Sequence, residues 1–111
     1  MCSSDLGATL LVEGEEKLRV AEINLRAGRK ANAAAAYASA RAYFSDGAAL
    51  LDEGAWVSHY ELMFSLSLEW ARAELLSGNS EKCEQLIEDL LQRRLSKVDT
   101  AAVYHLKILS H

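Results

Sequence analysis

The chain contains no proline, and it is rich in alanine, leucine, glutamate, arginine and lysine, which cost least inside a helix. β-branched residues are few and isolated. No run of four or more residues alternates apolar and polar side chains as a half-buried strand does. Because little besides a few glycines interrupts these helix-forming stretches, the sequence predicts an all-α fold.

The apolar periodicity predicts about five helices joined by short connections. Ser58 and Glu61 have the spacing of a capping box at the start of the third helix, and Ser80 can cap the fourth. The fourth has the clearest amphipathic stripe. The expected helices cover residues 9–27, 30–51, 58–76 and 80–95, and a fifth begins at residue 99 or 100 and runs to the end of the chain.

Two glycines divide the chain into similar halves. Gly28 and Gly78 each follow a helical stretch, and they lie 50 positions apart (78 − 28 = 50). A glycine just past the last periodic residue can take the left-handed conformation that ends a helix, so we expect both to be hairpin turns. Small residues recur at matching distances from the two glycines. Two helices can cross closely only if the side chains at the crossing are small, and we expect larger residues to pack beside these positions. The small residues are Ala21, Ala71, Ala33 and Cys83, and the larger ones are Tyr37 and Ile87.

This pattern is typical of antiparallel helical hairpins stacked as a tetratricopeptide-like (TPR-like) α-solenoid, although the spacing exceeds the usual 34 residues. We expect a first hairpin at residues 7–53, a second at 54–97, and the first helix of an incomplete third repeat at 98–111. Residues 1–6 are expected to be a non-native leader, because residues 2–6 match a sequencing-adapter tail read in frame.

Composition narrows the classes of partner. The net charge is −4 and no stretch concentrates basic residues, so we do not expect nucleic-acid binding. The strongest apolar window, around Leu62–Leu76, contains charged residues, which argues against a membrane span. Cys2 and Cys83 lack the spacing of a zinc site or a disulfide framework, which favours a cytoplasmic protein.

No set of residues predicts catalysis, metal binding or a cofactor. His59 lies near an acidic residue, but we favour a helix-start histidine over a phosphoacceptor. His105 and His111 are on nearly opposite helix faces, which does not suit two metal ligands. Cys83 is expected to be a buried, inert thiol.

Four aromatic residues leave two interpretations open. They could line a partner groove, since repeat arrays present concave surfaces, but packing in the core is the interpretation we favour. These residues are Trp56, Tyr60, Phe64 and Trp70.

Several stretches resemble one family. They are residues 21–31, 36–38, 43–44, 47–51 and 60–62, together with Trp56. They look like the helical region of large bacterial multidomain signalling proteins. In that family a serine/threonine kinase-like domain and a predicted AAA/STAND-type ATPase precede the helical repeats, and a GAF domain and a histidine kinase often follow. The resemblance covers packing residues, so it transfers no catalytic residue. It implies that the parent protein is an ATPase and a protein kinase.

We therefore expect a non-catalytic TPR-like segment that couples ATPase and kinase domains or mediates protein–protein interaction. The alternative is that the chain is part of an enzyme region and contributes directly to nucleotide binding or phosphoryl transfer. Arrays usually need about three repeats for stability, so we also predict marginal stability or self-association of this chain.

Overall fold

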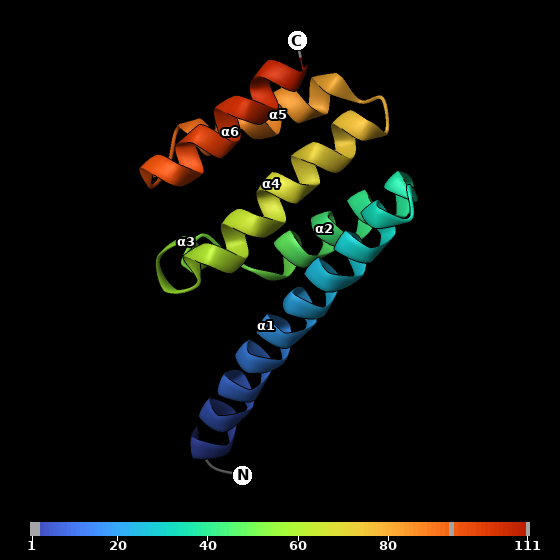
Figure 1. The fold of residues 1–111 in the computed structure, drawn as a ribbon. Coiled ribbons are helices and arrows are strands. Elements are labelled where there is room, and N and C mark those ends of the chain that lie inside the picture. Colours follow the sequence, from blue (N-terminus) through green and yellow to red (C-terminus); the bar gives the residue numbers. More distant parts are fainter. Residues whose placement is uncertain (1–2, 94, 111) are drawn as a thin grey trace.

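The computed structural model describes the backbone of residues 3–93 and 95–110, and side chains for 15–93 and 95–109. It contains six helices and, within the described ranges, no strand, which confirms the all-α prediction. No described helix is long and apolar enough to cross a membrane. The helices are α1 (Ser3–Ala33), α2 (Tyr37–Leu50), α3 (Ala55–Ser58), α4 (Tyr60–Leu76), α5 (Ser80–Leu91) and α6 (Lys97–Ser110) (Figure 1).

The first turn lies after Gly28, and the prediction of a helix end at that glycine is wrong. α1 continues through Gly28 to Ala33, and the chain turns at residues 34–36, where Ala35 has a φ of 59°. The amide of Ala36 donates to the carbonyl of Ala31 at 2.8 Å, which closes this turn. The alanine-rich residues after Gly28 favour continued helix, so the glycine alone does not end it.

This shift also moves two predicted packing residues. Ala33 lies exposed in the last turn of α1 and not on the second helix, so its expected role at a helix crossing is wrong. Tyr37 is the first residue of α2 and is half-buried. Ala40, further along α2, is fully buried, as is Ala21 on α1.

The second turn is at Gly78, between α4 and α5. Gly78 has a φ of 88°, and the amide of Asn79 donates to the carbonyl of Glu74 at 2.8 Å. This is the pattern by which a left-handed glycine closes a helix. Ala71, Cys83 and Ile87 are all buried in the core beside this turn.

The capping predictions for two helices are wrong. Ser58 ends the short helix α3, and its hydroxyl donates to the carbonyl of Gly54 at 3.1 Å instead of capping the next helix. α4 begins at Tyr60 after His59, and α5 begins at Ser80 after Asn79, in both cases without a side-chain cap hydrogen bond.

α4 is the central helix of the core. It contributes Leu66 and Ala73 to one buried cluster with residues of α1 and α2. It contributes Phe64 and Ala71 to a second cluster with residues of α5 and α6. In Figure 1, α4 lies between α2 and α5, and the backbones of these two helices do not approach each other.

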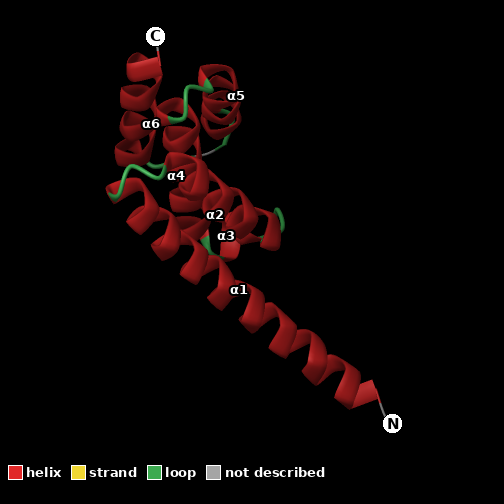
Figure 2. Cartoon of the chain, turned by 90° about the vertical axis from the view of Figure 1, so that its right-hand side faces the viewer, coloured by secondary structure: helices red, strands yellow, loops and turns green. Residues whose placement is uncertain are grey.

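The described helices form an elongated body of 56 × 30 × 20 Å, because the N-terminal part of α1 projects beyond the other helices (Figure 2). The stacking of its hairpins as a solenoid, and the predicted division at residues 7–53, 54–97 and 98–111, stay predictions. So does the non-native origin of residues 1–6, of which 1 and 2 lie outside the described residues.

Candidate functional site

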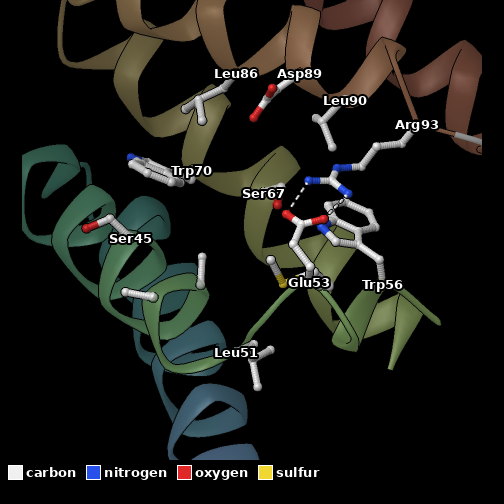
Figure 3. Close-up of a pocket in the computed structure, with 13 residues that line it drawn as sticks. Ser45, Leu51, Glu53, Trp56, Ser67, Trp70, Leu86, Asp89, Leu90 and Arg93 are labelled. Atoms are coloured by element: carbon white, nitrogen blue, oxygen red, sulfur yellow. Dashed lines mark hydrogen bonds and ion pairs between the residues drawn. The ribbon is translucent and has the colours of Figure 1, made fainter. Parts of the chain in front are cut away.

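A cavity of about 300 Å³ opens between α2, α4 and α5 (Figure 3). α4 forms its floor, α2 and α5 form its sides, and the connection from α2 to α3 closes one end. It combines apolar surface with two carboxylates and one guanidinium. The lining residues are Ser45, Ala48, Ala49, Leu51, Glu53, Trp56, Met63, Ser67, Trp70, Leu86, Asp89, Leu90 and Arg93.

The four aromatic residues of the predicted groove lie in two different environments. Trp56 of α3 and Trp70 of α4 both line the cavity. Phe64 is buried in the core, and Tyr60 stacks on it with ring centroids 5.9 Å apart. The Trp56 ring meets Tyr60 edge to face at 6.0 Å. Two of the four therefore face the cavity, whereas Tyr60 and Phe64 connect it to the core.

An ion pair joins the α2–α3 connection to the end of α5 beside Trp56. Nη1 and Nη2 of Arg93 donate to the two carboxylate oxygens of Glu53 at 3.0 and 2.9 Å. The guanidinium carbon lies 4.2 Å from the centroid of the Trp56 ring, which is a cation–π contact. The hydrogen bonds from Arg93, and then its charge, lower the pKa of Glu53, and the same pairing raises the pKa of Arg93.

The other tryptophan is fixed by a buried carboxylate. Nε1 of Trp70 donates to Glu74 at 2.9 Å, and Glu74 also accepts hydrogen bonds from Arg41 of α2 at 3.1 Å and from the Asn79 side chain at 3.2 Å. Glu74 is 6% exposed, and a buried carboxylate needs such donors. It holds α2, α4 and the second turn together. Sequence reasoning missed this role, although a glutamate inside the apolar run of α4 is the signal that indicates it.

The remaining predicted residues do not form a chemical site. Cys83 is fully buried, and burial raises the pKa of its thiol, with smaller contributions from the charges of Glu84 and Glu74. His59, between α3 and α4, and His105, on α6, are both exposed. His111 and Cys2 lie outside the described residues. In the part of the chain that the structure describes, no three His, Cys, Asp or Glu side chains are grouped to hold a metal.

Comparison with known proteins adds one relationship. Part of a histidine kinase is similar to this chain. The relative is the hybrid signal transduction histidine kinase G of Dictyostelium discoideum, which is 31% identical over 98 residues. The alignment covers 80% of this chain but only 3% of that protein. No protein-family model matches the sequence, and no solved structure is significantly similar to it.

This similarity supports a signal-transduction, multidomain context for the chain, which is the coarser part of what the family resemblance implies. It gives no support to a bacterial origin, because the relative comes from Dictyostelium discoideum. The ATPase and the TPR-like class are not supported by it either. The histidine kinase activity belongs to the relative, and this chain matches only a small part of that protein.

Proposed function

We propose that this chain is a non-catalytic, cytoplasmic helical segment of a larger signal-transduction protein, and that it couples neighbouring domains or binds a protein partner. Its similarity to a short part of a histidine kinase supports the signalling context. The observation that carries the interaction role is the outer face of α6.

α6 is apolar on two sides. Its inner side, with Val103 and Leu106, is buried in the core cluster that α6 forms with α4 and α5. Its outer face exposes four large apolar residues to solvent. These are Val98, Tyr104, Ile108 and Leu109, with 79%, 50%, 73% and 60% of their surface accessible. A helix with apolar residues on both sides is suited to packing between two layers, so this face supports contact with another protein element.

The alternative, direct participation in nucleotide chemistry, has no observation in its favour. The sequence contains no phosphate-binding loop of the G-x-x-x-x-G-K-[ST] type. The cavity lining carries two carboxylates against one guanidinium, which does not favour a polyphosphate.

Isothermal titration calorimetry with ATP and Mg²⁺ tests the proposal. We expect no saturable heat when the 111-residue chain is titrated. Saturable binding that is lost when ATP is omitted, or release of phosphate by the chain, would overturn the non-catalytic assignment and favour the alternative. A parallel titration of Mg²⁺ alone controls for metal binding by the acidic surface.

A further inference from the structure

We infer that the cavity between α2, α4 and α5 is a docking pocket for an arginine side chain of a protein partner. This inference rests on the proposed interaction role and adds to it the chemistry of the residue that is recognised. Four features of the cavity carry it: its charge, an internal example of the same contact, a tryptophan donor without an acceptor, and its size.

The charge of the lining favours a cation. Glu53 and Arg93 neutralise each other as a pair, which leaves the carboxylate of Asp89. Asp89 is close enough to Arg93 to interact with it electrostatically, but among the described residues it makes no hydrogen bond or ion pair. Figure 3 shows its carboxylate directed into the cavity, on the side of Trp70 and Ser67. A guanidinium that enters can form charge-assisted hydrogen bonds with this carboxylate.

Arg93 provides an internal example of the contact. Its guanidinium lies on the Trp56 indole and is held by both oxygens of Glu53. Trp70 and Asp89 place a second indole and a second carboxylate on the same cavity. Lys82 also lies over the Trp70 ring, at 5.1 Å, and it is not among the residues that line the cavity. The planar guanidinium suits this combination of a ring and a carboxylate better than an ammonium does.

The cavity also offers a group that can recognise the backbone of the partner. Nε1 of Trp56 is buried in the lining and has no hydrogen-bond partner. A buried donor without an acceptor is unfavourable, so a peptide carbonyl that reaches it gains a hydrogen bond that the free protein lacks. The side chain of Glu53 is 80% exposed and that of Arg93 27%, so the carbonyl reaches Nε1 when the Glu53 side chain, the outer member of the pair beside Trp56, swings into solvent and Arg93 follows.

The size of the cavity limits what can enter. A volume of about 300 Å³ accommodates one long side chain and its peptide unit, but not a helix. The apolar residues Leu51, Met63 and Leu86 can cover the methylene groups of the arginine stem. The pocket therefore fits a single arginine presented by an extended segment or a loop.

Nuclear magnetic resonance tests this inference, because the sequence has 2 tryptophans and therefore two indole N–H signals, one at each end of the cavity. The probe is the blocked tripeptide acetyl-Leu-Arg-Leu-amide. The control is the same tripeptide with citrulline, which has the shape of arginine without its charge. We expect both indole signals to shift in a saturable way with the arginine peptide, with affinity about tenfold higher than for the citrulline peptide.

Two variants locate the interaction. Asp89→Asn should reduce the affinity for the arginine peptide about tenfold, to the level of the citrulline peptide. Glu88→Gln removes a neighbouring exposed carboxylate that does not line the cavity, and it should leave the affinity unchanged. Circular dichroism checks that both variants fold. Equal binding of the two peptides, or an equal loss in both variants, would overturn the inference.

The same signals separate this inference from the proposed function. If neither peptide shifts the indole signals and Mg²⁺-ATP does not shift them, the arginine pocket is refuted while the interaction role through α6 still stands. If Mg²⁺-ATP gives saturable shifts, the non-catalytic assignment itself fails.

Discussion

The ring of Phe44 lies where a side chain at residue 28 would begin. A Cβ on Gly28 would be 2.7 Å from Cδ1 and Cζ of Phe44 and closer still to Cε1. Phe44 is fully buried, so its ring cannot easily move aside. At the scale of single residues, Gly28 is a site of close helix approach, whereas Gly78 has a positive φ and open space around it. The same residue type in similar sequence surroundings therefore has two different physical roles.

Gly28→Ala should destabilise the protein, although the same change in an open helix would stabilise it by about 1 kcal/mol. We expect a loss of about 1–3 kcal/mol in the free energy of unfolding, because overpacking strains the α1–α2 contact. Urea denaturation followed by circular dichroism measures it. In a double-mutant cycle, Phe44→Leu should relieve the effect of the alanine. An increase in stability on Gly28→Ala alone would contradict the proposed steric role.

At the scale of elements, periodicity and turn chemistry differ in how much they predict. The buried face of α5, with Cys83, Ile87 and Leu90, follows directly from its sequence pattern. The boundary between α1 and α2 does not follow from the sequence pattern. The alanines on both sides of it are compatible with a helix and also with a turn at Ala35. The packing of Gly28 on Phe44 joins residues of two helices, and local pattern contains no information about such a contact.

A hydrogen bond joins α4 to α6. The hydroxyl of Tyr60 donates to Asp99 at 2.7 Å. Burial raises the pKa of Tyr60, and the hydrogen bond to Asp99 raises it further. Because the folded-state pKa lies above the unfolded value, the stability from this contact is fully present below the unfolded pKa of about 10 and is lost as pH rises through the folded pKa.

Tyr60→Phe should therefore lower the free energy of unfolding by about 1 kcal/mol near neutral pH, because it removes the hydrogen bond and keeps the ring. It should also weaken the loss of stability that we expect for the unaltered protein above about pH 10. Denaturant unfolding at several pH values measures both effects. Tyr104→Phe is the matched control, since Tyr104 is on the exposed face of α6, and it should change neither. Identical pH profiles for Tyr60→Phe and the native protein would refute this account.

At the scale of the whole molecule, the candidate site depends on how α2, α4 and α5 are placed relative to one another. Its lining comes from α2, the α2–α3 connection, α4 and α5, and its charged pair joins Glu53 to Arg93 across 40 positions. The sequence indicates that aromatic residues cluster after residue 55, but it does not indicate that Trp56 and Trp70 face a cavity while Phe64 is buried. Small differences in helix register decide which of these aromatic residues face the cavity. The packing on both sides of α4 sets that register.

The shape of the molecule leads to the last prediction. Its radius of gyration is 15.5 Å, whereas a compact domain of this length would have about 13 Å. An elongated body with an exposed apolar face on α6 buries less apolar surface per residue than a compact one, so we expect marginal stability and self-association through that face. Association that favours the folded state makes the melting temperature depend on concentration.

We therefore expect the Tm of the isolated chain to rise by about 5 °C over about a hundredfold increase in concentration, and sedimentation to detect species larger than the monomer. The double variant Tyr104→Glu with Ile108→Glu should abolish both effects, because it places charges on the outer face of α6. Val57→Glu changes an exposed apolar residue on α3 and should preserve them. A cooperative, monomeric melt at high temperature that does not vary with concentration would contradict self-association through α6. It would also weaken the interaction role, because it would show that the apolar outer face of this helix is stable in water without a partner.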